Sequence, residues 1–275
     1  MDRAAPRPIP ALVLLPTGSG FWHNPGMGKR LLRFFGMAEW GGDELFLVSL
    51  ACAALAWALG SLVHPALALV ALPPWLIVVY FFRDPDRVSP QEAGLLVAPA
   101  DGTVTDIELL DEPRFLNARA WRVGIFLSPF NVHVNRVPCA GTAEYLRYCP
   151  GEFLPAYNAA APTRNEAFEM GLLTPGGERI MVKQITGVLA RRIVCPVQRG
   201  RTFLRGERYG MIKFGSRTEL YVRADGGYEI LVQLGQKVVG GETVLVRHVP
   251  QPAPAQEWTV SPAGAVTSSV ERADT

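Results

Sequence analysis

The chain has 275 residues, of which 49% are hydrophobic and 19% are charged, and its mean hydropathy is positive. This length can hold one large domain, or a medium-sized domain with an appendage. The net charge of +2 and the absence of basic runs interleaved with aromatic residues exclude an ordinary nucleic-acid-binding protein. The hydrophobic content is high for a soluble enzyme.

The cysteines give no metal or redox motif. They lie at Cys52, Cys139, Cys149 and Cys195, without Cys-x-x-Cys spacing. No cluster of histidine, cysteine and acidic residues has the spacing of metal ligands, so we predict no metal. We expect reduced thiols in a compartment that faces the cytosol. The apolar run at residues 11–15 is short and is broken by Pro16, so no cleavable signal peptide is expected.

The N-terminal third carries the apolar segments. Basic residues alternate with leucine and phenylalanine over residues 29–35, a pattern typical of a short amphipathic helix on an anionic membrane surface. The segments Leu45–Leu62 and Ala66–Phe82 are then almost wholly apolar, and His64-Pro65 separates them. Each is near the lower limit of about 17–25 residues for a helix that spans a bilayer.

Basic residues lie outside both apolar segments and not in their connection, which favours a helical hairpin with both ends on the cytoplasmic side. Pro73 and Pro74 would kink the second helix, so a shallow re-entrant hairpin stays open. Two buried helices of a soluble core are the weaker alternative, because runs this apolar rarely occur there in pairs.

The region from Val88 to about Val249 is rich in short strand-like runs separated by glycine and proline. This texture predicts a compact β sandwich or barrel with few helices. Two pieces, Leu96–Val104 and Leu234–Val244, look like the hairpins of a barrel-sandwich hybrid. The expected fold is therefore α+β and mainly β, with a barrel-sandwich-hybrid-like β domain preceded by an N-terminal apolar helical hairpin.

Three domains follow from these patterns. Residues 1–87 form a membrane-associating segment with the hairpin at about 45–82. Residues 88–249 form the β domain, and the Ala-, Pro- and Ser-rich tail 250–275 is expected to be disordered.

The pair Gly215-Ser216, with strand-like residues on both sides, is the junction that a self-cleaving proenzyme requires. The Ser216 hydroxyl could attack the Gly215 carbonyl and convert the amide into an ester. β-Elimination would then leave dehydroalanine, which hydrolyses to a pyruvoyl group. Glycine suits the scissile position because it tolerates strained backbone conformations. Taken alone, the pair is more typical of an ordinary turn.

Other motifs change this interpretation. Pro-Ala-Asp-Gly-Thr-Val at residues 99–104 and Ser-Pro-Phe-Asn-Val-His-Val-Asn-Arg-Val-Pro at 128–138 precede Phe-Gly-Ser-Arg at 214–217. Phe-Phe-Arg-Asp-Pro at 81–85 ends the apolar region. In this order, the four motifs closely resemble the phosphatidylserine decarboxylases, specifically their shorter prokaryotic branch. The resemblance runs from about residue 75 to residue 248.

The resemblance implies an enzyme on the cytoplasmic face of the cell membrane that decarboxylates phosphatidylserine to phosphatidylethanolamine and CO2. Its cofactor would be a covalent pyruvoyl group made from Ser216, and the phospholipid's amine would form a Schiff base with it. Residues 1–215 would become the larger β chain and 216–275 the smaller α chain. The two would stay together as a heterodimer through a shared sheet, and a higher oligomer stays open.

The resemblance also assigns roles to single residues. His133 matches the family's histidine and is the leading general acid/base, and its unperturbed pKa near 6.5 suits proton transfer at cellular pH. Asp101 matches the carboxylate that orients the base for self-cleavage, a role compatible with a turn aspartate that caps its own backbone.

This chain departs from the longer branch of the family at two positions. Where that branch has a second histidine, this chain has Arg136, which cannot act as a base. Either His133 serves both self-cleavage and decarboxylation, or Asp101 acts more directly. Arg136 would instead bind the substrate's phosphate or carboxylate, or pair with an acid such as Glu144. Asn131 replaces an acidic residue and is a further candidate for substrate binding.

Arg217, Lys213 and Lys183 are candidates for contact with the lipid phosphodiester, because the head group needs a cation near the pyruvoyl group. A cation exposed on a strand is more often simply solvated.

Two other functions remain open. A non-enzymatic, membrane-anchored barrel-sandwich module would explain the apolar segments but not the motifs around His133 and Ser216. A pyruvoyl decarboxylase of a soluble amino acid would explain the motifs. The paired apolar segments argue against it, because a soluble substrate gives no reason to hold the site at a bilayer.

Overall fold

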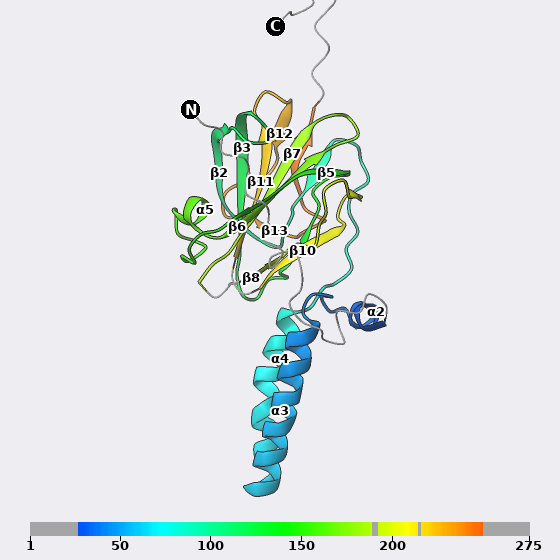
Figure 1. The fold of residues 1–275 in the computed structure, drawn as a ribbon, viewed down its shortest axis with the longest axis vertical. Helices are drawn as coiled ribbons and strands as arrows, with labels where there is room; N and C mark the ends of the chain where they lie inside the picture. The colour runs from blue at the N-terminus through cyan, green and yellow to red at the C-terminus, as the bar shows by residue number, and fades with distance from the viewer. Residues whose placement is uncertain (1–26, 189–191, 214–215, 250–275) are drawn as a thin grey trace, which may run out of the picture.

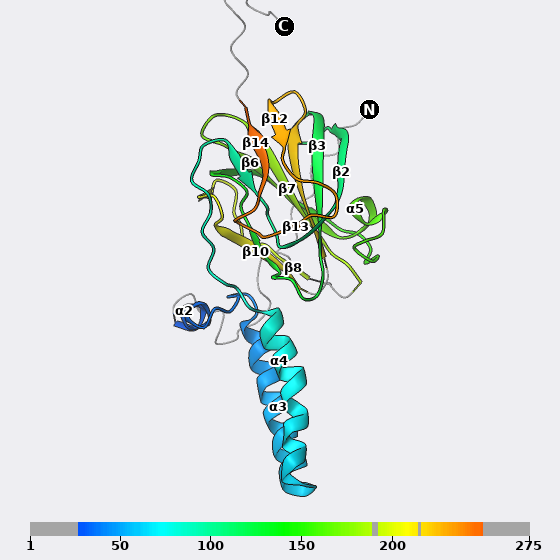
Figure 2. The same ribbon diagram turned by 180° about the vertical axis from the view of Figure 1, so that it is seen from behind.

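The computed structural model describes residues 27–188, 192–213 and 216–249. A helical hairpin projects from one end of a β domain (Figures 1 and 2). The predicted α+β, mainly β fold with an N-terminal apolar hairpin is confirmed. The predicted disordered tail at 250–275 and the residues Phe214 and Gly215 lie outside the described residues.

The helical part is almost entirely N-terminal. It comprises α2 (Met27–Phe34), α3 (Gly42–Leu62), the 3-10 helix η2 (Pro65–Ala71) and α4 (Leu72–Phe81), and the short α5 (Ala161–Arg164) lies within the β domain. The helix predicted around residues 29–35 is thus present as α2, and its contact with a membrane stays a prediction. In both views α2 lies beside the base of the hairpin and roughly crosswise to it.

Helix α3 has the length and surface of a membrane-spanning helix. Its 21 residues, at about 1.5 Å each, measure about 30 Å, which is the thickness of a bilayer's hydrocarbon core. Only Gly42 is buried, and large side chains such as Leu50 and Trp57 face outward. It is the one helix in the described ranges that is long and apolar enough to cross a membrane. A helix that is apolar on all sides and packs against little protein fits a lipid environment.

The second arm of the hairpin changes its helix type along its length. Pro73 and Pro74 lie in the first turn of α4, directly after η2, where a missing N–H group costs little. The two prolines therefore start an α-helix. The arms are joined by a hydrogen bond of 3.0 Å from Trp75 Nε1 to Ser49 Oγ.

The β domain contains fourteen strands in the described residues. They are β1 (Leu95–Val97), β2 (Gly102–Glu112), β3 (Ala118–Leu127), β4 (Val134–Arg136), β5 (Gly141–Cys149), β6 (Ala167–Leu173), β7 (Arg179–Ile185), β8 (Arg192–Val194), β9 (Thr202–Phe203), β10 (Arg208–Lys213), β11 (Ser216–Arg223), β12 (Tyr228–Ile230), β13 (Lys237–Val238) and β14 (Val244–His248).

These strands form three antiparallel sheets. The largest has the order β13-β2-β3-β11-β7-β6-β5-β9, and the smaller two have the orders β4-β10-β8 and β1-β14-β12. Strand β11 lies inside the large sheet, between β3 and β7. Because side chains alternate along a strand, Leu220 and Val222 face the main apolar core while Arg217 and Glu219 face the other way.

The two segments expected to form barrel-sandwich hairpins pair with each other. Lys237 and Val238 of β13 lie opposite Thr103 and Gly102 of β2. A Cβ at Gly102 would collide with the backbone oxygen of Phe126 on β3, so only glycine lets β2 begin so close to its neighbour.

An apolar cluster joins the hairpin to the β domain. It contains Ala38, Phe81, Phe82, Val132, Val134 and Met211. A salt bridge between Lys213 on β10 and Glu44 at the start of α3 adds a polar link. The base of the hairpin therefore packs directly on β4 and β10.

Candidate active site

Ser216 is the first residue of β11, and its side chain shares the core-facing side of the strand with Thr218. The residue has no exposed surface, and its Oγ has no hydrogen-bond partner within the described part of the chain. A buried hydroxyl without a partner is costly and uncommon, and such groups occur at reactive sites. The preceding residue of the predicted junction, Gly215, lies outside the described residues.

The motif around His133 lies against the strands that flank this junction. Strand β4 pairs with β10, and the amide of Ile212 donates a hydrogen bond of 3.2 Å to the carbonyl oxygen of His133. Asn135 donates from Nδ2 to Thr218 Oγ1 at 3.0 Å. The amide of Arg136 donates to the Pro99 carbonyl at 2.9 Å. The structure therefore brings three segments that are far apart in the sequence to one place.

His133 is held as a neutral imidazole. It has no exposed surface, and its Nδ1 lies 2.9 Å from the carbonyl oxygen of Asn131. Because a carbonyl can only accept, Nδ1 carries the proton and Nε2 keeps its lone pair. Burial lowers the pKa of His133 to about 4, against a smaller opposing effect of the Asn131 hydrogen bond. The ring packs on Phe81 of α4 with centroids 4.5 Å apart.

Asp101 lies directly before β2, at the same end of the sheet as Ser216. Strand β3 separates β2 from β11, so the two chain segments are about 10 Å apart. Oδ1 accepts the amide of Gly240 at 2.8 Å, and Oδ2 accepts Arg87 Nη2 at 3.0 Å. Burial raises the pKa of Asp101, while the Gly240 hydrogen bond and the Arg87 charge oppose this rise. Both carboxylate oxygens are thus held by groups that stabilise the anion.

Asn131 closes the turn before His133. Its Oδ1 accepts the amide of Ser128 at 2.9 Å and the Ser128 hydroxyl at 2.8 Å. Since its carbonyl oxygen also accepts from His133 Nδ1, this residue fixes both the turn and the tautomer of the base.

Arg136 is buried, and its guanidinium makes three hydrogen bonds. It donates to Asp84 Oδ1 at 2.9 Å, to the Pro85 carbonyl at 2.9 Å and to the Gly206 carbonyl at 3.1 Å. The acid that pairs with it is Asp84 and not Glu144. In this arrangement Arg136 ties the segment that leaves the hairpin to β4.

Arg217 and Lys183 lie on the face of the sheet opposite to Ser216. Arg217 follows Ser216 by one residue, so it points the other way, where Nε donates to Glu219 at 2.7 Å. Lys183 lies opposite both Glu219 and Glu169 in the register, and its Nζ is 3.4 Å from Glu169. Directly opposed residues share a face. The structure therefore does not bring these two cations together with Ser216.

Two further polar residues near Ser216, Gln184 and Thr218, were not predicted from the sequence. Gln184 donates from Nε2 to Asn135 Oδ1 at 2.8 Å, and Thr218 accepts from Asn135, so a wholly buried polar chain lies beside Ser216. The signal was the alternation of β7, in which Ile180 and Val182 face the core and Gln184 stands where a third apolar residue is expected.

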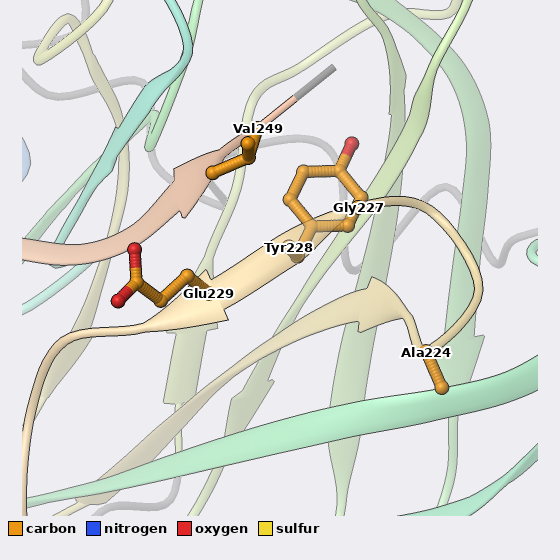
Figure 3. Close-up of a pocket in the computed structure, with 5 residues that line it drawn as sticks. All are labelled: Ala224, Gly227, Tyr228, Glu229 and Val249. Carbon is orange, nitrogen blue, oxygen red and sulfur yellow. The ribbon is translucent and has the colours of Figure 1, made fainter. Parts of the chain in front are cut away.

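Two cavities of about 380 Å³ each lie at the other end of the β domain. One is lined by Ala224, Gly227, Tyr228, Glu229 and Val249, and Figure 3 shows the Tyr228 ring beside Val249. The other shares Tyr228 and includes His248 and Glu178. Ala224 directly follows β11 at the end opposite to Ser216, roughly 25 Å along the strand, so these cavities are separate from the site.

Comparisons with known proteins agree with the motifs. A family model described as phosphatidylserine decarboxylase matches residues 76–246. A phosphatidylserine decarboxylase proenzyme of Symbiobacterium thermophilum is 47% identical over 201 residues, covering 73% of this chain and 90% of the relative. One of Chlorobium phaeobacteroides is 44% identical over 214 residues, covering 76% and 99%. One of Gluconacetobacter diazotrophicus is 48% identical over 172 residues, covering 62% and 76%.

Proposed function

The chain belongs to the phosphatidylserine decarboxylase family, and we propose that it cuts itself between Gly215 and Ser216 and then decarboxylates phosphatidylserine to phosphatidylethanolamine and CO2. The observation that carries this proposal is the Ser216 hydroxyl, which is fully buried, lies beside a histidine-bearing segment and has no hydrogen-bond partner among the described residues. The relatives are named as proenzymes, which supports a processing step.

Self-cleavage needs a nucleophile and a base. His133, neutral at cellular pH, accepts the Ser216 hydroxyl proton as Oγ attacks the Gly215 carbonyl carbon. An ester C–O bond forms and the amide C–N bond breaks as His133 returns the proton to the nitrogen, which frees the amine of residue 216. Removal of the Cα proton of residue 216 then expels the Gly215 carboxylate. The resulting enamine rearranges to an imine. Water hydrolyses this imine, which releases ammonia and leaves a pyruvoyl group.

The buried position of Ser216 fits a group made from that residue itself. When formed, the pyruvoyl group supplies an electrophilic carbonyl for the substrate's amine and accepts the electrons released with CO2. His133 is placed on a segment beside β11 to move protons. The chain of Gln184, Asn135 and Thr218 holds the start of β11 against β4 and β7.

The proposed fragments share the central strand of the large sheet. Cleavage leaves β11 in the smaller α chain, and this strand pairs with β3 along Ser216–Arg223 and with β7 along Arg217–Val222. A strand flanked on both sides holds the two chains together as a heterodimer. In this proposal residues 1–87 anchor the enzyme in the cell membrane at its cytoplasmic face, 88–249 form the catalytic domain, and 250–275 form the tail.

Intact-protein mass spectrometry of the purified chain beside a Ser216→Ala variant tests the proposal. We expect two fragments, residues 1–215 and 216–275, with a blocked N-terminus on the smaller, and a single chain for the variant. The cut enzyme should release CO2 from phosphatidylserine and not from free serine. A correctly folded wild-type chain that stays uncut would contradict the proposal.

A further inference from the structure

Most cations around the site already have carboxylate partners. The pairs are Arg87 with Asp101 and Glu242, Arg136 and Arg208 with Asp84, Lys213 with Glu44, Lys183 with Glu169, and Arg217 with Asp106 and Glu219. Arg83 is different: no carboxylate of the described residues lies within ion-pair distance of its guanidinium. A half-buried arginine without an acid is available to an anionic ligand.

Arg83 lies between the hairpin and the site and is held there by several contacts. Its backbone forms a bridge with Met37, just beyond the end of α4. Nη1 donates to the Tyr80 carbonyl at 2.8 Å, and Nη2 donates to the Phe130 carbonyl at 2.7 Å. The guanidinium carbon lies 3.8 Å above the centroid of the Tyr80 ring. These contacts leave further N–H donors free, because a guanidinium carries five.

The charge of Arg83 acts on both candidate catalytic groups. After burial and the Asn131 hydrogen bond, it is the next influence on the pKa of His133, which it lowers. It also helps to hold down the pKa of Asp101, whose rise is due to burial. Phe130 and His133 belong to the same short segment, so the contact with Phe130 places Arg83 at the edge of the site.

We propose that Arg83 binds the phosphodiester of the phospholipid substrate and so directs the serine end of the head group to residue 216. This inference rests on the function proposed above. The phosphodiester keeps its charge throughout the reaction, whereas the carboxylate loses its charge as CO2 leaves. A cation bound to the carboxylate would stabilise the ground state more than the transition state and so slow decarboxylation. The anion that a fixed arginine can bind without this cost is the phosphodiester. The end of a membrane hairpin is also the level at which head groups lie.

The first test compares Arg83→Gln and Arg83→Lys with Arg119→Gln as a matched control. Arg119 is exposed at the far end of β3, roughly 25 Å along that strand from the residue opposite Ser216. All variants should still cut themselves. For short-chain phosphatidylserine, Arg83→Gln should raise KM about 10–100-fold with little change in kcat, because the lost contact is equal in ground and transition states. Arg83→Lys should raise KM severalfold, and Arg119→Gln should leave it unchanged.

A second substrate identifies the bound group. Methylation of the phosphate gives a neutral phosphotriester that keeps the serine carboxylate. We expect this change to raise KM for the wild type and to have little further effect in Arg83→Gln, since both changes remove one contact. An equal increase in KM for the wild type and for Arg83→Gln would place the phosphodiester contact at another residue and overturn the inference.

The remaining outcomes separate the two proposals. A cut, active wild type with an unchanged KM in Arg83→Gln would overturn this inference alone. An uncut wild type would overturn the proposed function and this inference with it. A KM change that follows weaker binding to phosphatidylcholine–phosphatidylglycerol vesicles would show general membrane attraction and overturn the inference. If Arg83→Gln is not cut, Arg83→Lys decides the matter, and an unchanged KM contradicts the proposal.

Discussion

At the scale of the single residue, burial decides what His133 can do. Water would stabilise a charged imidazolium, and its exclusion lowers the pKa from 6.5 to about 4. The side chain is therefore neutral at pH 7, with the lone pair on Nε2 directed by the Asn131 hydrogen bond. A buried neutral histidine is a base that needs no partner carboxylate to stay deprotonated. This property suits a chain in which the position of a second histidine is occupied by Arg136.

The same shift predicts a pH dependence of stability. The unfolded chain binds a proton at His133 below about pH 6.5 and the folded chain only below about pH 4, so the free energy of unfolding falls as pH decreases through this window. The full loss is about 3 kcal/mol. We expect urea unfolding of the uncut Ser216→Ala protein in detergent to show most of this loss between pH 7 and pH 4.5. A Ser216→Ala/His133→Gln protein should lack that part of the slope, and identical slopes would contradict the buried neutral histidine.

At the scale of the element, the apolar hairpin and the strands followed from composition and alternation. The same alternation places Arg217 on the opposite face from Ser216, so its absence from the site was predictable from their adjacency. The partner of Arg136 was not predictable from the sequence. Asp84 lies on a segment that leaves the hairpin, and no local pattern indicates that this segment crosses β4. Likewise, the lack of a carboxylate of the described residues beside Arg83 depends on where the nearby acids lie in the folded chain.

The contact between Arg136 and Asp84 locks the segment below the hairpin onto β4, and its loss should be costly. Both side chains are buried, with 6% and 2% exposed. Arg136→Gln leaves Asp84 with Arg208 alone, so we expect a loss of about 3 kcal/mol in the free energy of unfolding. Arg164→Gln is the matched control, since its pair with Glu152 is exposed and should contribute less than about 1 kcal/mol. Urea midpoints compare the two, and an Arg136→Gln protein of normal stability with a raised KM would favour substrate binding instead.

At the scale of the whole molecule, the apolar hairpin and the candidate site pack against each other. Phe81 of α4 packs on His133, and the salt bridge from Glu44 holds Lys213, which directly precedes the residues of the proposed cleavage junction. Figures 1 and 2 show the hairpin leaving the β domain at the end where β8 and β10 lie. In the proposed function, the site lies where the hairpin meets the bilayer surface. A lipid head group then has only a short distance to travel.

This arrangement predicts that the hairpin controls access to lipid without controlling self-cleavage. Leu50→Asp with Leu55→Asp adds two charges to exposed positions of α3, each costing about 3 kcal/mol near the centre of a bilayer. We expect this double variant to cut itself normally, because Ser216 and His133 belong to the β domain. It should lose most flotation with lipid vesicles and most turnover of vesicle phosphatidylserine, while turnover of a dispersed short-chain substrate persists.

Leu204→Asp with Leu234→Asp changes two exposed leucines of the β domain and should leave flotation intact. Normal flotation of the α3 variant would show that α3 does not lie in the bilayer, whereas loss of self-cleavage would show that the hairpin must be inserted before the site can assemble.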